Sequence, residues 1–393
     1  MNRRGLHDIA IVGAGMVGAS LALRLAHEGF DVALIESREP GAWNANDEVD
    51  LRVVAIAPSS AEFLNRAGAW QAIASSRVSP YRMMHVWDSI APGELTFDAA
   101  DSGEAALGHI VENRLIQSVL WQELQHARIT LRVPANVEST ESNADRRTLT
   151  FDDGAVLHAR LVVAADGADS TLRDLVHIGA TTRDYGQRAV VAHVKTERPH
   201  ESTAWQRFLP NATLAFLPLA DGRSSIVWSL PTADAERLLA LDDATFCREL
   251  GAAFDFRLGT IDATTKRVAI PLRMRLANSY IAPRFALIGD AAHVVHPLAG
   301  QGVNLGLRDA AELVEILIEA RDAKRDFAAD HILRRYERRR RSDDTLSAHA
   351  FDTIQRVFAS GFPPFAALRG AGLAIADRVA PIKRRLARHA AGR

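Results

Sequence analysis

Apolar residues at the start of the chain are spaced as in a strand, a helix and a second strand. Residues 7–12 are almost continuously apolar, residues 16–27 carry apolar side chains at helical spacing, and residues 31–35 are apolar again. Gly29 stands where the C-cap of the helix is expected. Because two parallel strands joined by a helix require a sheet that is covered on both faces, this pattern predicts an α/β fold.

The middle of the chain predicts further helices and then a sheet of another kind. Helices are expected at 59–70 and 113–126, and a hairpin followed by a buried strand is expected between 148 and 165. From 181 to 271 short apolar segments alternate with turns, which is typical of a mostly antiparallel sheet. The expected strands of this sheet are 189–194, 203–208, 213–217, 224–230 and 266–270.

The α/β pattern returns with a strand expected at 285–288 and a helix at 303–320. We therefore predict an α/β protein with a Rossmann-like domain, an inserted and mostly antiparallel β-sheet domain, and a helical C-terminal segment. The expected Rossmann-like domain comprises residues 1–75, 105–180 and 272–326, the inserted domain comprises 76–104 and 181–271, and the C-terminal segment comprises 327–393.

Composition excludes several classes of protein. A chain of 393 residues, 48% of them hydrophobic, is long enough for two packed domains and is neither disordered nor fibrous. Its single cysteine, Cys247, permits no intrachain disulfide, so a reducing cytosol is the expected compartment. The sequence contains no uncharged apolar window of about 18 residues, so no segment is expected to span a bilayer.

Charge is distributed unevenly along the chain. Residues 321–393 contain 17 Lys and Arg against 8 Asp and Glu, whereas residues 1–320 contain 30 against 40. The stretch 375–388 interleaves apolar and basic residues, which is typical of a helix on an anionic membrane and equally of a helix packed on the body or on a partner protein. Nucleic-acid binding is not expected, because no nucleic-acid-binding motif accompanies the basic residues.

A glycine-rich turn links the first strand to the first helix. Gly13, Gly15 and Gly18 have the spacing of the dinucleotide-binding fingerprint, in which glycines let the backbone approach a pyrophosphate at the helix N-terminus and let helix and strand pack closely. Glu36 ends the second strand, where a carboxylate accepts hydrogen bonds from both ribose hydroxyls and repels a 2′-phosphate. FAD or NAD is therefore expected rather than NADP.

Two more acids follow predicted strands. Asp166 and Gly167 follow the strand that ends at residue 165, where they form either an ordinary capped turn or part of a ligand site. Asp290 follows the strand at 285–288, at the carboxyl edge of the sheet where α/β folds bind ligands. Its alternative roles are a helix N-cap and a partner for the ribityl hydroxyls of FAD; a nicotinamide enzyme has no need of this second site.

The loop after Asp290 is rich in glycine and opens into a helix. The N-terminus of such a helix stabilises the negative charge of a reduced flavin, so the loop is expected to line the flavin ring. The residues that form this loop and the start of the helix are Pro297, Gly300, Gln301, Gly302, Asn304 and Gly306.

Two other sets of residues invite a functional interpretation. His293 and His296 are three residues apart, but no further ligands accompany them, so no metal site is expected. Four aromatic residues of the inserted domain form either a wall of the substrate pocket or the core of the sheet. These residues are Trp205, Phe208, Phe216 and Trp228.

The order and sequence of these motifs resemble those of the single-component FAD-dependent aromatic hydroxylases, and most closely their ubiquinone-biosynthesis branch. The resemblance covers essentially the whole chain and is most specific at 296–306, with the sequence His-Pro-Leu-Ala-Gly-Gln-Gly-Val-Asn-Leu-Gly, and at Asp309. The implied FAD contacts are those of Gly13, Gly15, Gly18 and Glu36 with the ADP half, Arg52 and Arg114 near the phosphates, Asp166 and Gly167 with both FAD and the pyridine nucleotide donor, Asp290 with the ribityl chain, and 297–304 with the isoalloxazine ring.

The resemblance also implies the reaction. NAD(P)H or another donor reduces FAD, molecular oxygen adds to the reduced flavin, and the resulting C4a-hydroperoxide hydroxylates a hydrophobic, polyprenylated phenol. Such an enzyme is expected in the cytoplasm, with peripheral contact to the inner face of the membrane or to other proteins of quinone synthesis. Two alternatives stay open: a flavin reductase or dehydrogenase that inserts no oxygen, and a non-catalytic accessory subunit of a quinone-synthesis complex.

Overall fold

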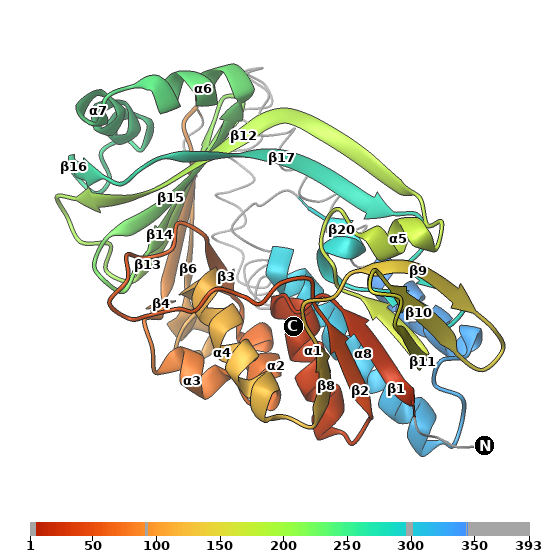
Figure 1. Ribbon diagram of the computed structural model, residues 1–393. Helices are drawn as coiled ribbons and strands as arrows, with labels where there is room; N and C mark the ends of the chain where they lie inside the picture. The colour runs from red at the N-terminus through yellow and green to blue at the C-terminus, as the bar shows by residue number, and fades with distance from the viewer. Residues whose placement is uncertain (1–4, 91–92, 296–301, 343, 345–393) are drawn as a thin grey trace.

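The computed structural model describes residues 5–90, 93–295, 302–342 and 344. Figure 1 shows an α/β body at the lower right and an antiparallel sheet at the upper left, joined by the long strands β12 (Ala180–Thr196) and β17 (Val268–Ala277). The predicted α/β fold with an inserted, mostly antiparallel sheet is therefore confirmed. The predicted helical structure of residues 345–393 lies outside the described residues.

The α/β body is built on an eight-stranded sheet with the order β18-β19-β11-β1-β2-β8, to which β10 and β9 are added at β11. β19, β11, β1, β2 and β8 are parallel, as the strand–helix–strand pattern predicts. The hairpin and the strand expected between 148 and 165 share one continuous strand, β11. The strands are β1 (Leu6–Val12), β2 (Val32–Ile35), β8 (Ile129–Arg132), β9 (Val137–Ser142), β10 (Arg147–Phe151), β11 (Val156–Ala164), β18 (Ile281–Ala282) and β19 (Phe285–Leu287).

Helices cover this sheet, and most of them lie where the apolar spacing predicts. The helix expected at 59–70 is instead two helices, because Gly68 adopts a φ of 85° just after the first one ends. A small antiparallel sheet, in the order β3-β7-β4, packs beside them. The elements are α1 (Met16–His27), α2 (Pro58–Arg66), α3 (Trp70–Ala74), α4 (Asn113–His126), α5 (Thr171–Leu175), α8 (Gly302–Asp322), β3 (Val53–Ile56), β4 (Ser79–Tyr81) and β7 (Gly108–Glu112), and residues 330–342 are also helical.

The antiparallel sheet has nine strands in the order β20-β17-β12-β15-β14-β13-β5-β6, with β16 paired to β12. All five predicted strands are present, and only the pairing of β13 with β5 is parallel. The short helices α6 (Thr232–Ala240) and α7 (Asp243–Ala253) were not predicted. The remaining elements are β5 (Met83–Asp88), β6 (Glu94–Asp98), β13 (Thr203–Leu209), β14 (Ala212–Pro218), β15 (Ser224–Pro231), β16 (Ile261–Thr264), β20 (His293–Val294), η1 (Ala99–Ser102) and η2 (Gly289–Ala291).

The two faces of the antiparallel sheet have different partners. Phe216 and Trp228 point to the face that packs against α6 and α7, where Phe216 stacks on Phe254 with ring centroids 3.8 Å apart. Trp205 packs against the same cluster, and Phe208 is buried in a separate one. The core interpretation of these four aromatic residues is therefore the one observed. The opposite face of the sheet turns towards the α/β body.

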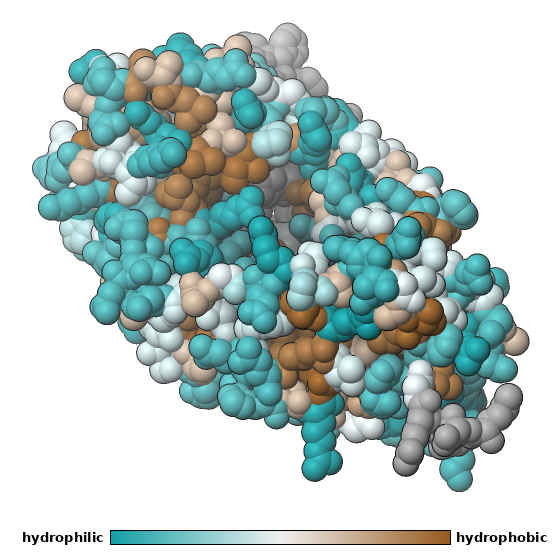
Figure 2. Space-filling view, in the orientation of Figure 1, coloured by the Kyte–Doolittle hydropathy of each residue, from teal (hydrophilic) through white to brown (hydrophobic). Residues whose placement is uncertain are grey.

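The outer surface is mostly hydrophilic, and Figure 2 shows it hollowed between the two bodies. Hydrophobic residues gather at the upper left of that view, where Figure 1 places the antiparallel sheet. Among the described residues, no helix combines the length and the apolar composition that a membrane span requires.

Candidate functional site

Four neighbouring parallel strands end at one edge of the α/β sheet, and each leads into a residue singled out from the sequence. β2 leads to Glu36, β1 to Gly13, β11 to Asp166 and β19 to the turn that contains Asp290. These strands are adjacent in the order β19-β11-β1-β2, so the edge spans three strand spacings, or about 14 Å. Residues from four distant segments thus line one side of the sheet.

The glycines of the first turn are required by close packing and by an open space. A Cβ atom on Gly13, which has a φ of 105°, would lie 2.3 Å from the carbonyl oxygen of Ala165. A Cβ atom on Gly18 would lie 1.9 Å from the carbonyl oxygen of Gly13. At Gly15, by contrast, a Cβ atom would meet none of the described residues within 4 Å. The space in front of the α1 N-terminus is therefore open, as the binding of a phosphate group requires.

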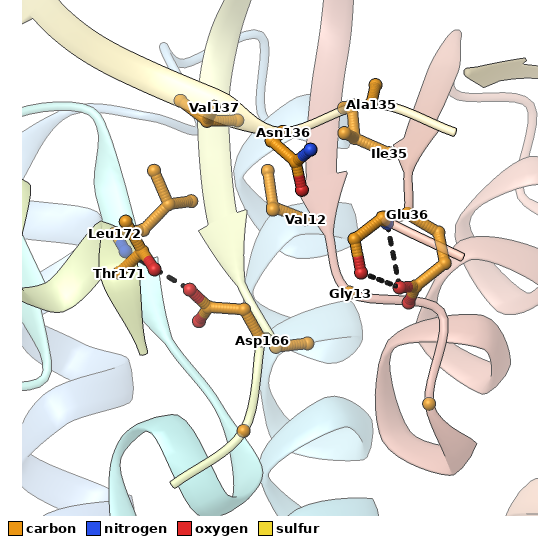
Figure 3. Close-up of a pocket in the computed structure, with 14 residues that line it drawn as sticks. Val12, Gly13, Ile35, Glu36, Ala135, Asn136, Val137, Asp166, Thr171 and Leu172 are labelled. Carbon is orange, nitrogen blue, oxygen red and sulfur yellow. Dashed lines mark hydrogen bonds between the residues drawn. The ribbon is translucent and has the colours of Figure 1, made fainter. Parts of the chain in front are cut away.

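A cavity of about 400 Å³ lies at this edge. Figure 3 shows Glu36 and Asp166 on opposite sides of it. Glu36 accepts hydrogen bonds from the backbone N–H groups of Ala14, at 2.6 Å, and Ser37, at 2.8 Å, which aim its carboxylate at the glycine turn. A wall that the sequence analysis missed consists of Ala135, Asn136 and Val137. This segment follows β8, the parallel neighbour of β2, so its position after a strand was the signal that could have revealed it.

Asp166 has one oxygen in use and one free. Its Oδ2 atom accepts a hydrogen bond from the backbone N–H of Leu172 at 3.1 Å, whereas Oδ1 is buried without a partner in the described part of the chain. Burial raises the pKa of this carboxyl group, although Ser170 and Leu172 oppose the shift. A buried, unpaired oxygen at the rim of a cavity fits a ligand that carries hydroxyl groups, as FAD does.

A second cavity, of about 380 Å³, lies between the antiparallel sheet and the α/β body. Asp290 and Arg52 face it, and no ion pair to Arg52 is found among the described residues. Asp290 is open to the cavity but lies deep in the molecule; this burial raises its pKa, Asp309 adds to the shift, and His293 opposes it. Asn113 lines the same cavity, and its buried Oδ1 atom has no hydrogen-bond partner among the described residues, a feature that the sequence did not reveal.

The first turn of α1 and the turn at Gly289 pack against each other between Glu36 and Asp290. The side chain of Val17, in the first turn of α1, lies 3.5 Å from where a Cβ atom on Gly289 would stand. A Cβ atom on Gly306 of α8 would lie 2.7 Å from Val17 and 3.0 Å from the Cα atom of Gly289. The glycine turn therefore contacts Glu36 through the N–H of Ala14, and the first turn of α1 packs against the turn of Asp290 through Val17.

The predicted flavin-lining residues are only partly described. Pro297, Gly300 and Gln301 lie outside the described residues. Gly302, Val303 and Asn304 form the first turn of α8, and a Cβ atom on Gly302 would meet no atom within 4 Å in the described part of the chain.

Two of the other predicted contacts are placed unexpectedly. The side chain of Asn304 is occupied, because it donates to the carbonyl oxygen of Ala55 at 2.7 Å and accepts from the N–H of Ala57 at 2.9 Å. Only the backbone of Asn304 is therefore available to a ligand. Arg114 lines neither cavity and donates instead to the carbonyl oxygen of Ala42 at 2.8 Å.

A buried ion network supports the turn that carries Asp290. Asp309 accepts from the N–H of Gly289 at 2.9 Å, pairs with His293 at 2.6 Å, and pairs through its other oxygen with Arg340 at 2.6 Å. Arg340 also binds Asp344 at 2.6 Å. The groups of His293, Asp309 and Asp344 are close enough to hold a metal ion, but Arg340 already compensates both carboxylates. The absence of a metal site stays a prediction, and His296 lies outside the described residues.

This buried ion network should make the free energy of unfolding decrease at alkaline pH. Burial would lower the pKa of His293, but Asp309 and Asp344 outweigh it and raise the pKa to about 9. Its stabilising charge is therefore fully present below the unfolded pKa of about 6.5 and lost as pH rises through about 9. We expect the free energy of unfolding, measured with urea between pH 6 and pH 10, to fall more steeply in the unmodified protein than in a His293→Gln variant. Equal slopes would show that His293 is not charged in the folded protein.

Comparison with known proteins identifies the family. The model of a family described as FAD binding domain matches residues 7–345. The 3-demethoxyubiquinol 3-hydroxylase of Escherichia coli (strain K12) is 38% identical, with 98% of each chain covered. Ubiquinone hydroxylase UbiL of Rhodospirillum rubrum is 37% identical over 98% of this chain and 89% of its own. The human mitochondrial ubiquinone biosynthesis monooxygenase COQ6 is 31% identical over 97% and 92%.

Solved structures share the fold at lower identity. p-Nitrophenol 4-monooxygenase PnpA from Pseudomonas putida has a TM-score of 0.76 at 20% identity, with 98% of this chain and 97% of that chain covered. Klebsiella pneumoniae HpxO, complexed with FAD and uric acid, has a TM-score of 0.72 at 19% identity, with 98% and 96% covered. The resemblance inferred from the sequence is confirmed, and FAD is the cofactor. The chain belongs to the FAD binding domain family and, within it, to the group that includes these ubiquinone-biosynthesis hydroxylases.

Proposed function

We propose that this protein uses FAD, a reducing donor such as NAD(P)H and molecular oxygen to hydroxylate the aromatic ring of a hydrophobic phenol in ubiquinone biosynthesis. The observation that carries the proposal is the cavity between the antiparallel sheet and the turn of Asp290. Its lining includes apolar side chains from both sides, among them Val53, Val191, Val227 and Leu272. Bound and reduced FAD supplies the activation of oxygen and its transfer to an electron-rich ring.

The residues along the sheet edge are suited to hold FAD in an extended form. We assign the ribose hydroxyls of the ADP half to Glu36 and the pyrophosphate to the turn from Gly13 to Gly18 at the positive end of α1. Asp166 with Gly167 lies next to this turn, in the same cavity. The ribityl chain is assigned to Asp290, and the ring to the backbone at the start of α8.

Two arginines are also assigned to FAD, and the structure supports the contact of Arg52 better than that of Arg114. Arg52 lines the second cavity without an ion pair in the described part of the chain, which suits contact with a phosphate or an adjoining part of FAD. Arg114 is half exposed at the start of α4 and lies 3.9 Å from Asp47. Its contact with a phosphate remains a prediction from the family resemblance and requires the side chain to leave Ala42.

The same cavity would position the substrate and exclude water. An apolar lining favours the transfer of an aromatic ring from water and keeps the oxygen-transfer step away from bulk solvent. Within this proposal, residues 1–75, 105–180 and 272–326 form the FAD-binding domain, 76–104 and 181–271 form the substrate domain, and 327–393 form the C-terminal region.

The finer parts of the proposal concern the tail of the substrate and the site of action. We place the protein in the cytoplasm, at the inner face of a membrane, acting on a polyprenylated phenol alone or with other proteins of quinone synthesis. The names of the relatives support a lipid-tailed quinone precursor. The alternation of apolar and basic residues at 375–388, which lies outside the described residues, supports contact with an anionic surface.

Labelled oxygen tests the function directly. The FAD-loaded protein, incubated with NADH or NADPH, a prenylated phenol and ¹⁸O₂, is expected to yield a product that carries one labelled oxygen, as measured by mass spectrometry. The matched control is the same protein stripped of FAD, which should give no product. Oxidation of the donor with an unlabelled or absent product would support a reductase and contradict the proposal.

A further inference from the structure

Four uncharged polar side chains on the antiparallel sheet face the second cavity. They are Gln206, Thr213, Ser225 and Ser229, and we call the three that lie near one another in the register, Gln206, Thr213 and Ser229, the polar arc. Their exposed fractions are only 7%, 9% and 5%, yet their side chains form no hydrogen bond with any of the described residues. Buried polar groups in folded proteins are normally paired, so a cavity lined by three unused ones favours a ligand that pairs with them.

The register of the sheet brings the polar arc together. Thr213 on β14 lies directly opposite Ser229 on β15, where Cβ atoms are about 5 Å apart. Gln206 on β13 lies opposite Ala215, so it is the diagonal neighbour of Thr213, about 7–8 Å away and within reach of a long side chain. The three groups, which come from three different strands, therefore converge on one part of the cavity.

The surroundings of the polar arc are small or apolar. Ser229 is flanked by Ala189 on β12, and Ala215 is flanked by Val227 on β15. These four residues line the cavity together with Ile270. The two alanines and the valine are small and apolar, so they leave room for a ring, and the hydrogen-bonding groups on this side are those of the polar arc and Ser225.

Charge distinguishes the ligands that the polar arc can accept. Among the described residues that line the cavity, those of the antiparallel sheet are uncharged, and the charged ones, Arg52 and Asp290, lie on the side of the α/β body. Hydroxyl and amide groups both donate and accept hydrogen bonds, so they match a phenol hydroxyl and the oxygen of an ether. An ionised carboxylate placed against the polar arc would lose its hydration without gaining a cation.

We infer that the polar arc binds neutral oxygen substituents of the substrate ring and selects phenols with a second neutral oxygen substituent over aryl carboxylates. The inference rests on the proposed function for the identity of the ligand as an aromatic ring. Gln206, Thr213 and Ser229 are thus specificity-determining residues on the side of the ring opposite Asp290.

Calorimetric titration of the FAD-loaded protein tests this assignment without relying on turnover. Three probes are compared: 2-prenylphenol, 2-methoxy-6-prenylphenol and 4-hydroxy-3-prenylbenzoate. The unmodified protein should bind the methoxyphenol about 3- to 10-fold more tightly than the simple phenol, the range expected for one added neutral hydrogen bond, and should bind the benzoate most weakly. Thr213→Val, Ser229→Ala and Gln206→Met should each reduce or abolish the methoxy preference while changing the affinity for the simple phenol less.

Ser224→Ala is the matched control. Ser224 lies on the same strand as Ser229 but on the opposite face of the sheet, and its buried hydroxyl has no partner in the described part of the chain. This variant should keep the methoxy preference and FAD content. The inference is overturned if the unmodified protein shows no methoxy preference, if it binds the benzoate most tightly, or if the polar-arc variants keep the preference. Probe binding with the predicted preference but no hydroxylation would support the polar arc and contradict the proposed function.

Discussion

Replacing Gly15 with alanine is expected to remove FAD from the protein while leaving its fold intact. Gly15 precedes α1 with a φ of −65°, which alanine adopts without strain, and a Cβ atom there would meet no atom of the described residues within 4 Å. The added methyl group would instead occupy the space through which a pyrophosphate approaches the helix N-terminus. Hydrogen bonds to charged groups are worth about 1.5–3 kcal/mol each, so losing one or two should weaken FAD binding about 100-fold or more.

The measurement is the FAD dissociation constant, from quenching of flavin fluorescence, together with the melting temperature of the flavin-free protein. Flavin-free forms must be compared because bound FAD itself stabilises the fold. Gly41→Ala is the matched control, since a Cβ atom there also meets nothing within 4 Å but Gly41 lines neither cavity. Unchanged FAD affinity in Gly15→Ala would show that the pyrophosphate does not approach this turn.

Replacing Asp309 with alanine is expected to lower the free energy of unfolding by about 3–5 kcal/mol. This is the range for breaking a buried ion pair by removing one partner, because the remaining charge stays buried and uncompensated. Asp309 is fully buried and contacts three groups: His293, Arg340 and the N–H of Gly289. The turn before Asp290 should also loosen, so the variant is expected to bind FAD more weakly.

Urea unfolding of the flavin-free variants at pH 7 measures this effect. Asp309→Asn keeps nearly the same volume and one acceptor oxygen, which can serve either the N–H of Gly289 or Arg340 but not both, so it should lose less stability than Asp309→Ala. Asp322→Ala is the control on the same helix, because Asp322 is exposed at the end of α8 and pairs only at the surface, with Arg321 at 3.2 Å. A loss of less than about 1 kcal/mol in Asp309→Ala, the size of a surface pair, would contradict the role of the network.

Local patterns in the sequence were sufficient for much of the fold. α1 and α4 have the predicted bounds because their apolar residues recur at helical spacing, and at α1 the glycines before and after the helix also mark its ends. The motif residues Gly13, Glu36, Asp166 and Asp290 reach one edge because they follow adjacent parallel strands, which is a property of the topology.

Other features depend on contacts that no local pattern contains. α6 and α7 are short and lie between strands, so their helical spacing covers only two or three turns. The alternation of residues along a strand places Phe216 and Trp228 on one face of the antiparallel sheet, but it does not say what packs against that face. Only the structure shows that α6 and α7 do. The polar arc and the network around Asp309 join residues from different strands and helices. Strand register and helix packing therefore bring these residues together, and neither can be read from a local pattern.

The most direct test of the account is an experimental structure of the protein with FAD. The account predicts one FAD molecule per chain, with its ribose hydroxyls at the carboxylate of Glu36, its pyrophosphate beside Gly15 and its ribityl chain at Asp290. FAD density that reached only one of the two carboxylates, or that lay away from the edge formed by β19, β11, β1 and β2, would contradict it.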